Sequence, residues 1–144
     1  MRLGARLLTL AAAGALLVGC SSTPAEKLQD WWSSGGDDRV KTLSDTSGRV
    51  NTASVQTMDD KGAACQELLT AVAKAKKLGT PPTQKGRDFW ADAMTAFEHG
   101  GNECVTGVGK KDEPQTNEGI REVQRGLSSL AAAVSMIRID IKDK

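Results

Sequence analysis

The sequence has no tyrosine, only two phenylalanines and a single histidine, His99. Because His99 stands alone, the chain has no second imidazole for a multi-histidine metal site or for a serine-based triad. It also lacks a Gly-x-Ser-x-Gly elbow and a glycine loop of the kind that binds phosphate. We therefore expect no cofactor, no bound metal and no enzymatic activity.

An excess of basic charge is also missing. The chain has 19 basic and 18 acidic residues, which gives a formal net charge of +1, and no cluster of lysines and arginines is visible. Nucleic-acid binding needs a concentrated basic face. The charge balance therefore argues against nucleic acid as a partner.

The sequence has no apolar run at its start long enough to cross a membrane, for which about 18 to 20 residues are needed. The apolar stretch from Leu7 to Val18 is shorter and contains Thr9 and Gly14. It follows two basic residues, Arg2 and Arg6. A basic start followed by a short apolar stretch is typical of a removable export signal.

This segment ends in Leu16-Leu17-Val18-Gly19-Cys20. The last four residues resemble the lipobox of bacterial lipoproteins, in which diacylglycerol is attached to the cysteine thiol and cleavage makes that cysteine the new N-terminus. The resemblance implies a signal peptide at residues 1–19, a lipidated tether at 20–24 and a helical domain at 25–144. Two acyl chains on one residue satisfy the requirement for stable anchoring. We therefore expect a protein held by Cys20 at the extracytoplasmic face of the cell membrane. The alternative is an ordinary export signal that leaves Cys20 as a free thiol.

Removal of residues 1–19 would leave 125 of the 144 residues, enough for one domain with a modest core. Arg2 and Arg6 would be lost, so 17 basic residues would face 18 acidic ones, for a net charge of −1. The anchoring would then depend on the fatty acids and not on attraction to anionic lipid.

Two cysteines remain besides Cys20. In an oxidising compartment Cys65 and Cys104 have only one intramolecular pairing, so we predict a disulfide between them. It would close a loop of about 40 residues, worth about 4 kcal/mol in the chain-entropy treatment. The alternative is a reactive or metal-binding pair, but the Cys-x-x-Cys spacing is absent.

Apolar residues at helical spacing predict an all-α fold, and no alternating strand pattern is present. A short helix at 25–32, ended by Ser33-Ser34-Gly35-Gly36, is expected before a bundle of four main helices. Asp37 or Asp38 should cap the first main helix, and Asp59-Asp60 the second. The first three main helices are expected at about 37–57, 59–78 and 85–108, with the disulfide between the second and third.

Apolar residues three or four positions apart recur through the fourth main helix. They are Ile120, Val123, Leu127, Leu130, Val134, Ile137 and Ile141. We interpret them as a core-facing stripe and not as a coiled-coil seam, because e and g charge pairs are missing. The Gly100-Gly101 pair in the third helix indicates a close neighbouring backbone or a bend.

The aromatic residues are the candidate binding residues. Trp31 and Trp32 fit either an interfacial belt beside the membrane or a cap on the core, and the scarcity of aromatics favours the core. Trp90 and Phe97 share the stripe of the third helix, where an apolar slot between helices could hold a small molecule or lipid.

Other polar residues offer little chemistry. His99 and Glu103 are one helical turn apart and could serve an enzyme, although no third ligand or partner is identifiable and a solvated histidine is favoured.

The order of these features is similar to a group of small lipoproteins and secreted proteins of actinobacteria. The resemblance covers Trp31 to Val108 best and is carried by Trp31, Gly35, Gly36, Ala64, Cys65, Pro81, Pro82, Trp90 and Cys104. Thr83-Gln84 departs from the group, in which a further apolar residue and a proline tend to follow the Pro-Pro turn. The resemblance implies a disulfide-bridged helical bundle and no particular activity. We therefore expect a non-enzymatic binding module of the cell envelope, with an envelope protein or a small apolar molecule as its partner.

Overall fold

The computed structural model describes residues 21–142, and within that range every regular element is helical. The elements are α1 (Pro24–Trp31), the π-helical turn η1 (Trp32–Gly36), α2 (Asp37–Ala53), α3 (Met58–Leu78), α4 (Gln84–Lys110) and α5 (Glu113–Lys142). The all-α prediction is confirmed. The proposed signal peptide and Cys20 lie outside the described residues.

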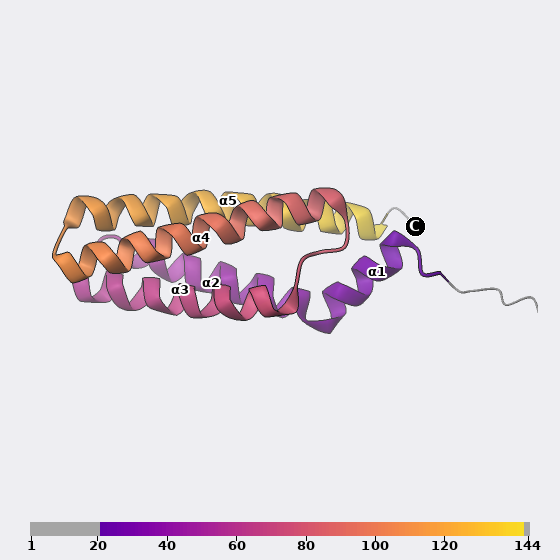
Figure 1. Cartoon of the computed structure of the whole chain (residues 1–144), viewed down its shortest axis with the longest axis horizontal. Helices are drawn as coiled ribbons and strands as arrows, with labels where there is room; N and C mark the ends of the chain where they lie inside the picture. The colour runs from indigo at the N-terminus through magenta and orange to yellow at the C-terminus, as the bar shows by residue number, and fades with distance from the viewer. Residues whose placement is uncertain (1–20, 143–144) are drawn as a thin grey trace, which may run out of the picture.

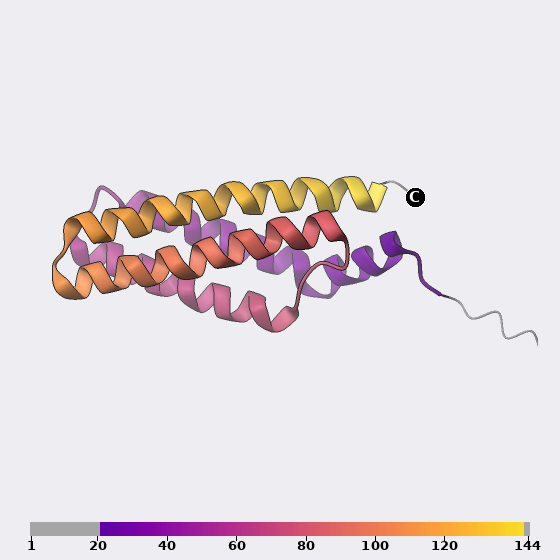
Figure 2. The same cartoon turned by 45° about the horizontal axis from the view of Figure 1, so that its top comes forward.

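The four main helices form an antiparallel bundle with short connections, as Figures 1 and 2 show. Each helix packs against its neighbours in the order α2, α3, α4, α5 and back to α2, and α1 packs against α5. We use the term tether end for the end of the bundle where α1 begins and α5 finishes, on the right of Figure 1. No helix among residues 21–142 is both long enough and apolar enough to span a membrane.

The junction between α1 and α2 agrees with one prediction and corrects another. α1 ends at Trp31, and Gly35, whose φ is +135°, has a non-helical backbone that kinks the chain before α2, as expected for residues 33–36. Asp37 and Asp38 do not cap α2, because its N-cap is Gly36, with no side-chain bond. The Asp37 N–H instead donates to the Trp32 carbonyl of the preceding turn. A helix entered from another helical turn already has carbonyl partners for its first N–H groups.

The caps of α1 and α3 are side-chain caps. Thr57 is the N-cap of α3, and its hydroxyl accepts from the Asp60 N–H while the Asp60 carboxylate accepts from the Thr57 N–H. Asp60 therefore contributes to the cap as predicted, but as the third helical residue of a capping box and not as the N-cap. Thr23 and Glu26 form the same motif at the start of α1.

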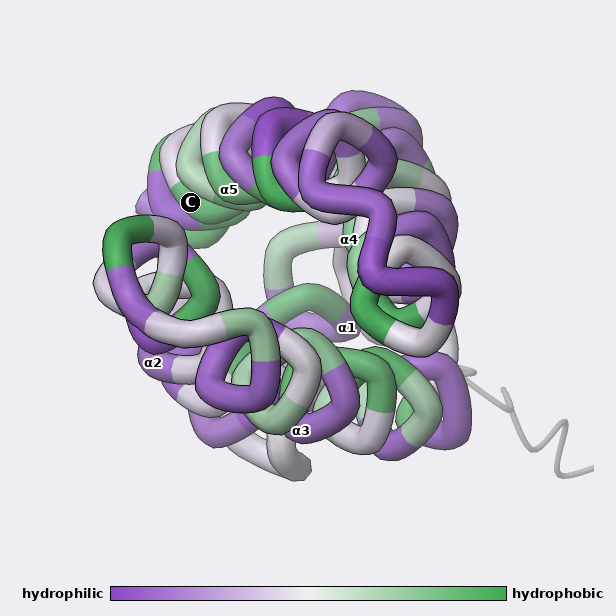
Figure 3. Tube along the Cα trace, turned by 90° about the vertical axis from the view of Figure 1, so that its left-hand side faces the viewer, coloured by the Kyte–Doolittle hydropathy of each residue, from purple (hydrophilic) through white to green (hydrophobic). Residues whose placement is uncertain are grey.

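Apolar side chains of all four main helices meet in one core, and Figure 3 shows these helices arranged around the bundle axis. The disulfide between Cys65 and Cys104 is present, with Cα atoms 6.3 Å apart, and joins α3 to α4 inside this core. Both predictions, the bridge and the bundle of four main helices with a short N-terminal helix, are confirmed.

Glycines bring α4 and α5 into backbone contact. A Cβ atom on Gly119 would lie 2.6 Å from the Gly100 carbonyl oxygen, and one on Gly100 would lie 2.6 Å from the Gly119 carbonyl oxygen. Real Cβ atoms do not come this close to other heavy atoms. The Gly100-Gly101 pair therefore marks a close approach of two helices, the first of its two predicted explanations.

Candidate functional site

The candidate binding aromatics lie in or against the core. The side chains of Trp90 and Phe97 are 2% and 0% exposed. Trp31 is half-buried and meets Trp90 edge to face, with ring centroids 5.4 Å apart, and Trp32 is tilted against Trp31 at 6.5 Å. A ligand could reach Trp90 or Phe97 only by displacing packed side chains. The core interpretation of the Trp31 ring is therefore supported by its contact with Trp90.

The His99 and Glu103 pair is not assembled into a site. His99 is exposed, and the Glu103 carboxylate accepts a hydrogen bond of 2.8 Å from the Gln115 side chain, which ties α4 to α5. Among residues 21–142 no three His, Cys, Asp or Glu side chains are grouped so that they could hold a metal ion. The hydrogen bond with Gln115 therefore gives Glu103 a structural role in joining α4 to α5.

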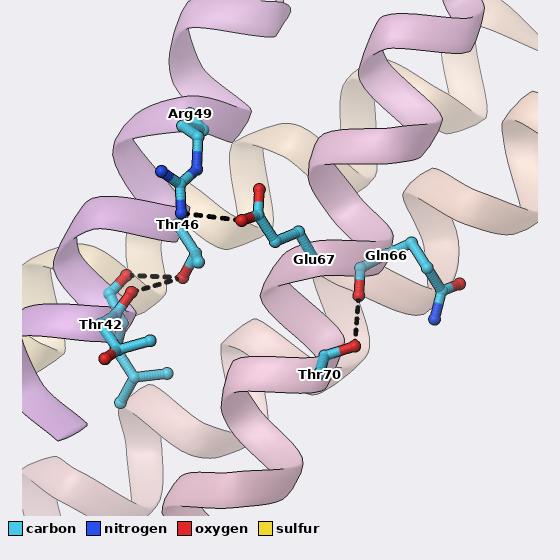
Figure 4. Close-up of polar contacts among 7 residues, drawn as sticks. Thr42, Thr46, Arg49, Gln66, Glu67 and Thr70 are labelled. Atoms are coloured by element: carbon cyan, nitrogen blue, oxygen red, sulfur yellow. Dashed lines mark hydrogen bonds and ion pairs between the residues drawn. The ribbon is translucent and has the colours of Figure 1, made fainter.

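Polar contacts within and between α2 and α3 are also structural (Figure 4). An exposed salt bridge of 2.8 Å joins Arg49 to Glu67. The buried Thr46 hydroxyl donates to carbonyls of its own helix, those of Thr42 and Leu43, at 2.8 and 3.2 Å. Such bonds satisfy a hydroxyl that would otherwise be buried without a partner. They explain how α2 tolerates many serines and threonines in a packed helix.

Lys61 is a buried cation at the end of the bundle opposite the tether end. Its Nζ atom lies 3.3 Å from the Asn117 Oδ1 atom and 3.7 Å from a carboxylate oxygen of Glu113. The side chain is only 5% exposed, whereas that of Glu113 is 69% exposed. Lys61 therefore joins the start of α3 to the start of α5, and we assign it a structural role.

A surface groove between α2 and α5 is the best candidate for a binding site. It has a volume of about 490 Å³, within the range of small-molecule sites. Val40 and Ser44 of α2 form one side, and one face of α5 forms the other. The α5 residues are Leu127, Leu130, Ala131, Val134, Ser135, Arg138, Ile139 and Lys142. The groove is apolar along most of its length, with two cations and no carboxylate among the residues that line it.

Several apolar side chains in the groove are only partly covered by the rest of the bundle, although Val40 and Leu127 also pack against the core. Leu130 is buried, but Leu127, Val134 and Val40 are only half-buried, and Ile139 is 47% exposed. The sequence stripe includes Leu127 and Val134 and predicts that both face the core. Leu127 does pack against the core, whereas Val134 is half-buried at the groove between α5 and α2.

No family model matches the chain, and no curated protein or solved structure is similar to it. The groove was not predicted from the sequence. The signal that could have found it is the second row of α5, Ala131, Ser135, Arg138 and Lys142, which lies beside the apolar stripe and ends in two basic residues.

An exposed ion pair on α5 lowers the pKa of one carboxyl group. A hydrogen bond from the Arg121 guanidinium, together with the charges of Arg121 and Arg125, lowers the pKa of Glu118. Because Glu118 and Arg121 are three residues apart on an exposed helix, this is a surface ion pair and not a sign of catalysis.

Proposed function

We propose that the protein is a non-enzymatic binding module of the cell envelope, anchored by a lipid on Cys20 at the extracytoplasmic face of the membrane. The observation that carries the proposal is the groove between α2 and α5, where mostly half-buried apolar side chains line a volume of about 490 Å³. Small-molecule sites are concave and mostly apolar with a few polar groups, and the residues that line this groove are of those kinds. The binding surface is therefore the groove and not the buried aromatic residues.

The position of α1 suits an anchored protein. Its capping box at Thr23 and Glu26 leaves only residues 21–23 between Cys20 and the helical domain. Three extended residues span at most about 11 Å. A lipid on Cys20 would therefore hold the tether end of the bundle close to the headgroups. The Cys65–Cys104 disulfide supports an oxidising compartment, which agrees with export.

The anchor is tested by changing Cys20 to alanine in the producing cells, with Ser21→Ala as the matched control. We expect the unchanged chain and the control to remain with washed membranes and to show acyl mass on a chain that begins at Cys20. The Cys20→Ala chain should lose both properties. Membrane retention of that variant after a detergent-free wash would contradict the anchor.

The binding role is tested with a photoreactive amino acid in the groove. Ala131 is an exposed groove residue, and Ala63 is an exposed alanine that lines a separate recess between α2 and α3. We expect irradiation of whole cells to produce an adduct at position 131 and none at 63. Adducts at neither position, or equal adducts at both, would contradict a binding role for the groove.

A carrier of a small apolar molecule is the second candidate function. The apolar lining of the groove favours it, whereas the burial of Trp90 and Phe97 gives a slot at those residues no support. A carrier releases its ligand to solvent or to another protein, and a fixed binding module does not. Exchange of a bound, labelled ligand between purified copies of the protein separates the two, since rapid exchange favours the carrier.

The enzyme hypothesis can be tested directly, although no contact between His99 and Glu103 supports it. Metal analysis of the purified protein and a His99→Ala comparison address it together. We expect no bound metal and an unchanged phenotype or ligand binding in the variant. Stoichiometric metal that is lost in His99→Ala would contradict the non-enzymatic proposal.

A further inference from the structure

The groove between α2 and α5 has a chemical polarity along its length. Leu127, Leu130 and Val134 lie toward its inner end, and Arg138 and Lys142 lie in the last turns of α5. Within residues 21–142 neither of these two cations takes part in a salt bridge. A ligand that matched the groove would have an apolar body and an anionic head.

The spacing of the two cations suits a single anionic group. Arg138 and Lys142 are four residues apart, so they lie on the same face of α5 with Cβ atoms about 6 Å apart. Side chains at this separation can converge on one phosphate, for which guanidinium and ammonium groups are the usual partners.

The length of the groove suits an acyl chain. From Leu127 to Lys142 the helix rises about 22 Å, at 1.5 Å per residue. One leaflet of a bilayer has a hydrocarbon thickness of about 15 Å, half of the usual 30 Å core. The α5 face of the groove is therefore longer than the distance that one acyl chain spans within a leaflet.

The cationic end of the groove is also the end nearest the proposed anchor. Figures 1 and 2 show the start of α1 beside the end of α5, and α1 packs against α5. A lipid on Cys20, separated from α1 by residues 21–23, would hold Arg138 and Lys142 near the phosphates of the bilayer surface. The apolar end of the groove would point away from the membrane.

We infer that this groove binds an anionic phospholipid of the anchoring membrane, with one acyl chain along α5 and the phosphate between Arg138 and Lys142. The inference rests on the proposed anchored binding module and names its ligand class. The lipid would leave the bilayer only in part, because its head stays at the surface while one chain lies on the protein. Such a contact would fix the orientation of the bundle on the membrane.

The test uses the lipidated protein in vesicles, with the photoreactive amino acid at Ala131 or at Ala63. One set of vesicles contains phosphatidylcholine alone, and the other contains equal parts of phosphatidylcholine and phosphatidylglycerol. Intact-mass measurement after irradiation identifies the adduct. We expect a phosphatidylglycerol adduct at position 131 that exceeds both the phosphatidylcholine adduct there and any adduct at position 63.

The cations are tested by the double change Arg138→Gln and Lys142→Gln, with Lys74→Gln and Lys77→Gln as the matched control. Lys74 and Lys77 lie in the last turns of α3, and their loss removes the same charge. A cation near an anionic surface raises affinity about fivefold, so the groove variant should lose up to about 25-fold in adduct yield at low salt. The control should keep the wild-type yield, because the covalent anchor already supplies the membrane attachment. All four substituted side chains are exposed, and unchanged helicity by circular dichroism confirms that each variant is folded.

The outcomes separate the inference from the proposed function. Equal yields for the two lipids, equal yields at positions 131 and 63, or no effect of the groove variant would overturn the inference. A protein adduct at position 131 in cells, or an adduct with a second copy of this chain, without a lipid adduct in vesicles, would also overturn it but would leave the binding module standing. The absence of any adduct in both settings would contradict the two together.

Discussion

Trp31 at the end of α1 meets Trp90 of α4 edge to face, with ring centroids 5.4 Å apart and an interplanar angle of 87°. This is a favoured geometry for two aromatic rings and is worth about 0.5 to 1.5 kcal/mol beyond the burial of their area. Trp90 belongs to the core, so the contact joins the helix nearest the proposed anchor to the centre of the bundle.

Trp31→Ala is therefore expected to lower the free energy of unfolding by about 2 to 3 kcal/mol, less than a fully buried tryptophan because Trp31 is half-buried. Phe89→Ala is the matched control, since Phe89 is an aromatic residue that is 37% exposed and should cost about 1 kcal/mol or less. Urea unfolding of the full mature chain measures both. Equal losses in the two variants would mean that the ring contact adds nothing.

Replacement of glycine by alanine should have opposite effects on stability at Gly119, which lies at the backbone contact between α4 and α5, and at Gly48, which does not. Gly119→Ala would place a Cβ atom 2.6 Å from the Gly100 carbonyl oxygen, so it should destabilise by about 1 to 3 kcal/mol through overpacking. Gly48 in α2 has no atom within 4 Å of a built Cβ, so Gly48→Ala should stabilise by about 1 kcal/mol through helix propensity. Thermal unfolding of the two variants measures both changes in stability. A rise in the melting temperature for Gly119→Ala would refute the close approach of α4 and α5.

The disulfide should be a major part of the stability. Reduction of the Cys65–Cys104 bridge releases a sequence separation of 39 residues and should lower the free energy of unfolding by about 4 kcal/mol. Urea unfolding with and without a thiol reductant measures this change. Because both cysteines are fully buried, reduction should require partial unfolding and should proceed faster as urea rises. Rapid reduction that did not depend on urea would contradict the buried position.

The ion pair on α5 predicts a pH dependence with a definite sign. Hydrogen bonding and charge from Arg121 lower the pKa of Glu118 in the folded chain. A carboxylate with a lowered folded-state pKa stabilises the fold above its unfolded pKa, about 4.3, and this contribution is lost as the pH falls through the folded value. An NMR titration should place the Glu118 midpoint below its ordinary value, and Arg121→Gln should raise it. A midpoint unchanged by Arg121→Gln would assign the shift to another group.

Much of the fold could be predicted from residues close together in the sequence. The 3.6-residue periodicity, the glycine and proline connections and the pairing of Cys65 with Cys104 are enough to predict the helical bundle and its cross-link. The predicted aspartate N-cap of α2 is wrong, because the N-cap there depends on how the preceding turn leads into the helix. Asp37 has the right residue type for an N-cap, but the π turn before it already supplies a carbonyl partner to its N–H.

The sequence by itself determined the helix spacing, the disulfide and the place of the glycines, because these depend on local periodicity and on there being a single pair of thiols for the bridge. Only the tertiary structure decided which apolar residues lack a cover. Leu127 and Leu130 belong to the same stripe and both line the groove, yet Leu130 is buried and Leu127 is only half-buried. A stripe defines one face of a helix, but the position of α2 beside α5 determines how much of that face is covered.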